Sequence, residues 1–96
     1  MAIKTSHYDA AEYLETDEDI AAYLDAVFED GDPALVAKAL GAVARAKGMT
    51  DIAEQSGLGR TSLYKALSED GNPEFATVMK VMKALGLNMK VATAAA

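Results

Sequence analysis

One stretch, from Met49 to Leu67, constrains the fold of this chain more than any other; it reads MTDIAEQSGLGRTSLYKAL. It predicts a helix, a tight turn at residues 56–59 and a second helix. Gly57 suits the left-handed backbone conformation that ends a helix and turns the chain. Leu63 lies four residues before Leu67, so the two turn one side of the second helix toward the core. We therefore expect two short helices that pack closely around the turn.

The outer side of the second helix carries side chains that form hydrogen bonds. Such side chains suit phosphate oxygens and base edges. Thr50 is expected to cap the first helix with its hydroxyl group and is also a candidate phosphate contact. This layout is that of a DNA-reading helix-turn-helix, although two helices joined at a glycine also occur in proteins that never bind DNA. The predicted DNA-binding residues are Thr50, Arg60, Thr61, Ser62, Tyr64 and Lys65. For Tyr64 the alternative is a packing role.

Composition narrows the class of protein. With 96 residues, 51% of them hydrophobic, and only two prolines, the chain is expected to form one domain of packed helices. The absence of cysteine excludes disulfides, thiolate metal sites and cysteine catalysis. No apolar run approaches the ~18 residues that span a bilayer. Because a signal-peptide core is absent as well, we expect a cytoplasmic protein with no membrane partner.

Catalytic and metal-binding patterns are not found in the sequence. His7 is the single histidine and has no second metal ligand near it, whereas a metal site needs several ligands. The acidic residues form no recognisable catalytic arrangement with a histidine, serine or lysine, and the chain has no phosphate-binding glycine loop. We therefore expect a protein that is not an enzyme and that holds no cofactor or metal.

The charge of the chain is divided unevenly along its length. The net charge is −6, but residues 1–32 contain ten acidic residues and one lysine, whereas residues 33–96 contain eight basic and five acidic residues. Two parts with opposite charge are suited to different partners.

Helix signals also precede the central stretch. Residues 1–7 carry no periodic signal and are expected to be flexible, and residues 8–14 could form a short extra helix. Thr16 is a good cap for the next helix, because hydroxyl side chains accept a hydrogen bond from the first turn. Asp32 followed by Pro33 is a strong start signal for another helix.

The C-terminal part is predicted to hold one more helix and a possible strand. Residues 87–91 alternate apolar with polar side chains, which indicates a short strand; a lone strand would pair most simply with its copy in a second subunit, and an irregular tail is the alternative. The expected boundaries are a helical domain over residues 8–88, a helix-turn-helix over residues 49–68, and a strand or tail over residues 89–96. The last helix is predicted from about Glu74 to Leu85, with Phe75, Val78, Met79, Met82 and Leu85 facing the core.

Several blocks of the sequence resemble the small addiction-module antidote proteins, which are antitoxins with a helix-turn-helix of the phage repressor and Cro type. The most specific block is LYKALSEDGNP at residues 63–73, followed by a phenylalanine at residue 75. Others are DAAEYL at residues 9–14, IAAYL at residues 20–24 and DGDPAL at residues 30–35. The resemblance covers about residues 8–88.

This resemblance implies an all-α, five-helix lambda repressor-like DNA-binding domain with a short extra N-terminal helix. It implies the antitoxin of a type II toxin-antitoxin module, which neutralises a small basic toxin of the RelE/ParE type and represses its own operon. Such repressors bind double-stranded operator DNA as homodimers, with one recognition helix in each half-site. The start of that helix falls on Arg60 and Thr61, where Arg60 could make two hydrogen bonds to a guanine. Gly59 stands where related repressors often carry a polar residue.

The acidic N-terminal part is the predicted surface for the toxin, because acidic side chains complement a basic partner. Acidic helix faces also serve solubility alone, which is the plainer interpretation. Two other functions stay open: a stand-alone transcriptional regulator without a toxin, and a protein-interaction module that does not bind an operator. The predicted toxin-binding residues are Glu12, Glu15, Asp17, Glu18, Asp19, Asp25 and Glu29.

Overall fold

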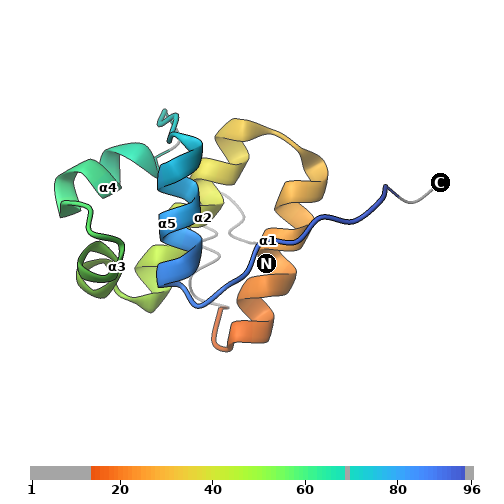
Figure 1. The fold of residues 1–96 in the computed structure, drawn as a ribbon, viewed down its shortest axis with the longest axis horizontal. Helices are drawn as coiled ribbons and strands as arrows, with labels where there is room; N and C mark the ends of the chain where they lie inside the picture. Colours follow the sequence, from red (N-terminus) through yellow and green to blue (C-terminus); the bar gives the residue numbers. More distant parts are fainter. Residues whose placement is uncertain (1–13, 69, 95–96) are drawn as a thin grey trace, which may run out of the picture.

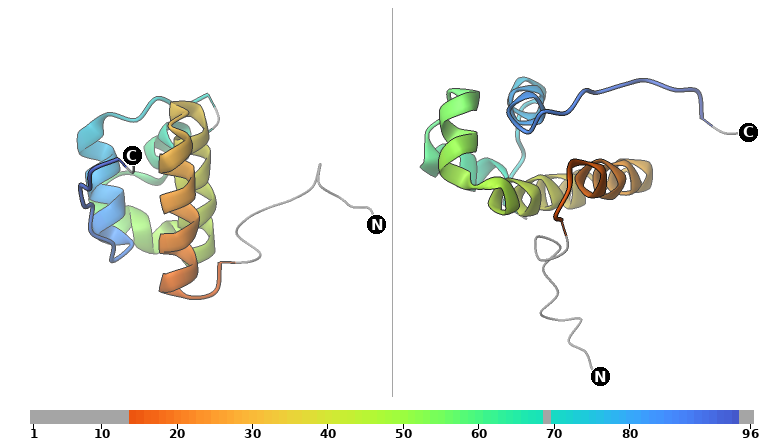
Figure 2. Two further views of the ribbon diagram at one scale, coloured as in Figure 1. Left: turned by 90° about the vertical axis from the view of Figure 1, so that its right-hand side faces the viewer. Right: turned by 90° about the horizontal axis from the view of Figure 1, so that it is seen from below.

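The computed structural model describes residues 14–68 and 70–94. This part contains five α-helices: α1 (Asp17–Asp30), α2 (Pro33–Lys47), α3 (Met49–Ser56), α4 (Arg60–Ala66) and α5 (Phe75–Ala84). α1 and α2 lie side by side, and α3 and α4 lie on the far side of α2 and α5 from α1 (Figures 1 and 2). α5 packs against α3 and closes the bundle. The predicted all-helical class is therefore confirmed for the described residues.

The first two helices begin where the sequence predicts, because each start is fixed by a local hydrogen bond. At α1 the Thr16 hydroxyl oxygen accepts from the N–H of Asp19 at 3.0 Å, and the Asp19 carboxylate accepts from the N–H of Thr16 at 3.2 Å. This pair is a capping box. At α2 the Asp32 carboxylate accepts from the N–H of Ala34 at 3.0 Å, with Pro33 as the first helical residue.

The prediction for the N-terminal end cannot be compared with the structure, and the prediction of a C-terminal strand differs from it. The predicted flexible residues 1–7 and all of the predicted helix 8–14 except Leu14 fall outside the described residues. Within the single chain the possible strand at residues 87–91 does not form: residues 87–94 are neither helix nor strand. The physical reason is that a strand needs a neighbour for its backbone hydrogen bonds, and the described part of this chain contains no other strand.

The side of α5 that faces the core also differs from the predicted one. Val81, Met82 and Leu85 are buried, whereas Phe75 and Met79 are 66% and 51% exposed. At 3.6 residues per turn, the two exposed residues lie about a third of a turn or more around the helix from Val81. Met82 and Leu85 are buried as predicted, but the core side of α5 is rotated so that it includes Val81, which the prediction omitted, and excludes Phe75 and Met79.

Candidate nucleic-acid interface

The turn between α3 and α4 is held by backbone geometry and one serine. Gly57 has φ 78° and ψ 11°, in the left-handed region, and its N–H donates to the carbonyl oxygen of Ala53 at 3.0 Å. The Ser56 hydroxyl oxygen accepts from the N–H of Leu58 at 3.3 Å. Leu58 is half-buried against the core. The predicted turn at residues 56–59 is therefore observed, with Gly57 in the role expected of it.

Thr50 does not cap α3, contrary to the prediction. The cap position belongs to Gly48, and no side chain caps this helix. Gly48 has φ 106° and turns the chain directly from α2 into α3. α3 consequently starts at Met49, before Thr50 is reached. The hydroxyl-bearing side chain of Thr50 lies exposed in the first turn.

α4 is divided into a buried side and an exposed side. Leu63 is 0% exposed, and Leu67, which follows the helix, is 3% exposed. These two side chains fix α4 on the core, as their spacing predicted. The exposed side carries five of the six predicted DNA-binding residues: Arg60, Thr61, Ser62, Tyr64 and Lys65.

A hollow of about 480 Å³ lies between the end of α2, the start of α3 and α4. It brings together three of the predicted residues, Thr50, Arg60 and Tyr64, whereas Thr61, Ser62 and Lys65 do not line it. Arginine side chains at such a hollow are suited to the oxygens of a phosphate group. Asp51 also lines the hollow and contributes a negative charge to it.

Arg45 is a lining residue of this hollow that the predicted set omitted. It lies in the last turn of α2, where a basic side chain suits the negative end of a helix. The sequence therefore gives a reason for a basic residue at this helix end. It does not show that Arg45 lines the same hollow as Arg60, which follows from the folded arrangement of α2 and α4.

Arg60 and Tyr64 contact each other along α4. One terminal guanidinium nitrogen of Arg60 donates to the Tyr64 hydroxyl oxygen at 3.3 Å, and the guanidinium carbon lies 5.6 Å from the centre of the tyrosine ring. Tyr64 is 46% exposed. Its ring therefore supports the arginine on the exposed side of α4, and both side chains remain accessible to a ligand.

The predicted toxin-binding residues divide by the contacts they make. Asp17 forms an ion pair with Lys47 at 3.1 Å, and Asp19 belongs to the capping box, where it also accepts from the N–H of Glu15 at 3.3 Å. Glu12 lies outside the described residues. Glu15 is exposed just before α1, and the other three, Glu18, Asp25 and Glu29, are exposed on α1.

These three residues share one face of α1. They stand seven and four residues apart, which are near-whole numbers of turns at about 3.6 residues per turn. α1 carries six acidic residues and no basic residue between Asp17 and Asp30. Figures 1 and 2 show α1 and α4 on opposite sides of the bundle. The acidic face and the exposed side of α4 are therefore separate surfaces.

Sequence comparison shows to which known family the chain belongs. A family model described as probable addiction module antidote protein matches residues 4–93. The chain belongs to this antidote family. A protein of Haemophilus influenzae (strain Rd), described as uncharacterized, is similar to this antidote family member, with 47% identity over 91 residues that cover 95% of this chain and 94% of the relative. No solved structure matches the chain.

An antidote implies a cognate toxin, so membership of the antidote family implies a protein partner for this chain. Within the residues that the structure describes, no helix is both long enough and apolar enough to cross a membrane.

Proposed function

We propose that this chain is the antitoxin of a type II toxin-antitoxin module. In this proposal it binds its own operator as a homodimer through the exposed side of α4, represses transcription, and neutralises a small basic toxin of the RelE/ParE type. The function is one of binding, with no catalytic step. Membership of the antidote family supports the antitoxin role.

One observation carries the DNA-binding part of the proposal. The hollow beside α4 is lined by two arginines, Arg45 and Arg60, and by the exposed Thr50. Phosphate contacts from such residues position a protein on the duplex, while contacts from the start of a recognition helix read the bases. In our proposal Arg60 reads a base edge, and Arg45, Thr50 and Lys65 contact phosphates.

The proposal is tested by measuring the affinity of the protein for the DNA immediately upstream of its gene, by fluorescence anisotropy at fixed salt. Scrambled DNA of the same length and composition is the control, because phosphate contacts alone bind both sequences equally. We expect tighter binding to the upstream sequence. Equal affinity for both sequences, or no binding at moderate salt, would instead favour a protein-interaction module that does not recognise an operator.

Asp51→Asn is expected to strengthen operator binding. The substitution removes a negative charge from the hollow that Arg45 and Arg60 line. A carboxylate about 4 Å from a phosphate in water costs about 1 kcal/mol, which corresponds to roughly fivefold in affinity. The same anisotropy measurement checks this result. Asp30→Asn, at the end of α1, is the matched control and should leave the affinity unchanged; weaker binding by Asp51→Asn would mean that this carboxylate accepts a hydrogen bond from the DNA.

Toxin binding is proposed to use the acidic face of α1. The double variant Glu18→Gln and Glu29→Gln is expected to bind the protein encoded by the adjacent gene about tenfold more weakly, mainly through slower association. The measurement is surface plasmon resonance at two salt concentrations. The control is the double variant Glu54→Gln and Glu74→Gln, which changes the net charge equally but lies outside α1. Equal loss in both variants would show that overall charge matters and the α1 face does not.

A further inference from the structure

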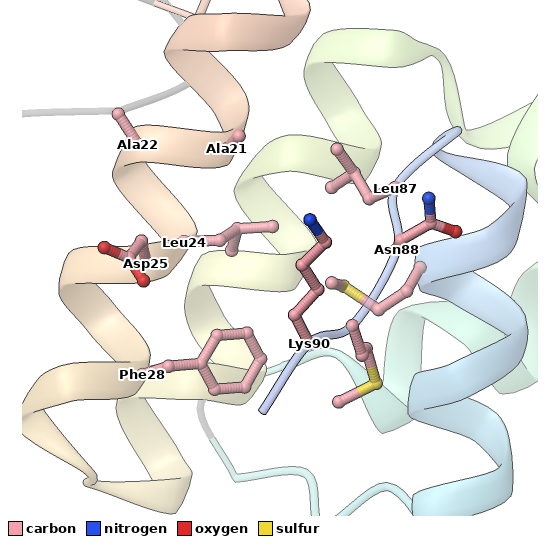
Figure 3. Close-up of a pocket in the computed structure, with 10 residues that line it drawn as sticks. Ala21, Ala22, Leu24, Asp25, Phe28, Leu87, Asn88 and Lys90 are labelled. Atoms are coloured by element: carbon pink, nitrogen blue, oxygen red, sulfur yellow. The ribbon is translucent and has the colours of Figure 1, made fainter. Parts of the chain in front are cut away.

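An apolar groove of about 610 Å³ lies between α1 and the segment that follows α5 (Figure 3). Leu24 and Phe28 point from α1 toward this segment, and Leu87 and Lys90 lie opposite them. Met89 also lines the groove. Phe28 is 38% exposed and Met89 is 44% exposed, so two large apolar side chains of the groove meet solvent.

The segment after α5 carries an unpaired backbone. The N–H of Leu87 donates to the carbonyl oxygen of Met82 at 3.0 Å, which ties the start of the segment to α5. From Asn88 to Ala94, no backbone group hydrogen-bonds within the described part of the chain. The right-hand view of Figure 2 shows this segment running out from α5 toward the C-terminus, and Val91 is 100% exposed. An extended backbone with free hydrogen-bonding groups is a template for a further strand.

We propose that a second copy of this chain fills the groove with its own residues 87–91. The two segments pair antiparallel across a two-fold axis at Met89. Each segment thereby enters the partner's groove, with the partner's segment on one side of it and the partner's α1 on the other. This inference rests on the proposed function in one respect, because it names the surface through which the operator-binding homodimer forms.

The side-chain pattern of the segment selects this pairing. Centring the pair on Met89 places Leu87 opposite Val91 of the partner subunit, with all apolar side chains on one face, and cross-strand apolar pairs stabilise a sheet. It also places Lys90 opposite an asparagine. Centring the pair on Lys90 would instead put two lysines opposite each other, which is destabilising.

The charges of the groove also favour a second copy. Lys90 is the only charged residue in residues 87–94. α1, which forms the other wall, carries only acidic charges, and its Asp25 lines the groove. Residues 87–94 bring no negative charge to this wall, and in the proposed pairing their apolar face lies against Leu24 and Phe28 of α1. Two copies of α1, in contrast, would repel each other if they met face to face.

Charge-swap variants at Met89 test the proposal by analytical ultracentrifugation, without DNA or toxin. We expect the wild type to be a dimer. Met89→Lys and Met89→Glu alone should each be monomeric, because each pairing would place two like charges opposite each other. An equimolar mixture of the two variants should recover the dimer, because the opposed charges then attract. Circular dichroism of each variant should show unchanged helix content.

Leu35→Lys is the matched control. Leu35 lies on α2, is 38% exposed like Phe28, and does not line the groove; this variant should remain dimeric. A monomeric wild type, dimeric Met89 variants, or a mixture that stays monomeric would each overturn the proposed pairing. Since no DNA is present, these outcomes are distinct from a failure of operator binding, which is measured with upstream DNA.

Discussion

Arg60→Ala is expected to weaken binding to the operator about 5- to 150-fold while leaving binding to scrambled DNA within about twofold. The first number follows from the about 1–3 kcal/mol of discrimination that an arginine with two hydrogen bonds to a guanine supplies. Arg60 is the first residue of α4, and its guanidinium group lies on the exposed side of that helix beside Tyr64. Removing it should therefore remove sequence recognition. The measurement is anisotropy with both DNA sequences at one salt concentration.

Two comparison variants separate base reading from charge. Lys65→Ala, also on the exposed side of α4, should weaken binding to both sequences equally and reduce the slope of log K against log salt by about one, as expected for a lost phosphate contact. Lys38→Ala, on α2 and outside the hollow beside α4, should change neither quantity. If Arg60→Ala weakened binding to both sequences by the same factor, Arg60 would be a phosphate contact and the assignment of the base-reading residue would be wrong.

Gly41→Ala is expected to lower the free energy of unfolding by about 1–3 kcal/mol, the usual cost of forcing an extra methylene group into a packed core. Gly41 lies in α2, and a Cβ atom at this position would collide with the backbone carbonyl oxygen of Leu67, directly after α4. In open space the same change would stabilise a helix by up to about 1 kcal/mol. The collision outweighs this gain, because a backbone carbonyl cannot move without shifting α4. Urea denaturation monitored by circular dichroism measures the effect.

Gly59→Ala is the control for Gly41→Ala. Gly59 has φ −71°, which any residue adopts, and a Cβ atom there would meet nothing within 4 Å. Its free energy of unfolding should change by no more than about 0.5 kcal/mol. A Gly41→Ala variant as stable as Gly59→Ala would show that α2 and the end of α4 do not approach each other closely.

The helix boundaries could be predicted from the sequence because local chemistry sets them. Thr16 and Asp32 accept hydrogen bonds from residues two or three positions ahead, and Gly57 ends α3 through its own backbone conformation. None of these contacts depends on the rest of the fold. The exposed side of α4 was predictable as well, since the burial of Leu63 follows from its spacing to Leu67.

Features that depend on contacts between distant segments could not be predicted. Periodicity placed Phe75 in the core, but the packing of α5 on α3 turned Val81 inward instead. Arg45 joins Arg60 only because α2 ends beside α4. The cap assigned to Thr50 failed because a glycine conformation at Gly48, set by the junction of α2 and α3, started the helix earlier.

Hydroxyl-radical footprinting of the upstream DNA tests the central claim most directly. If α4 reads the operator in a two-fold dimer, the wild type should protect two half-sites on one face of the duplex, centred about 34 Å or one helical turn apart, as expected for recognition helices in successive major grooves. Arg60→Ala should lose both protections together at the same protein concentration. A wild-type footprint without a defined position, or one that Arg60→Ala leaves intact, would contradict the account.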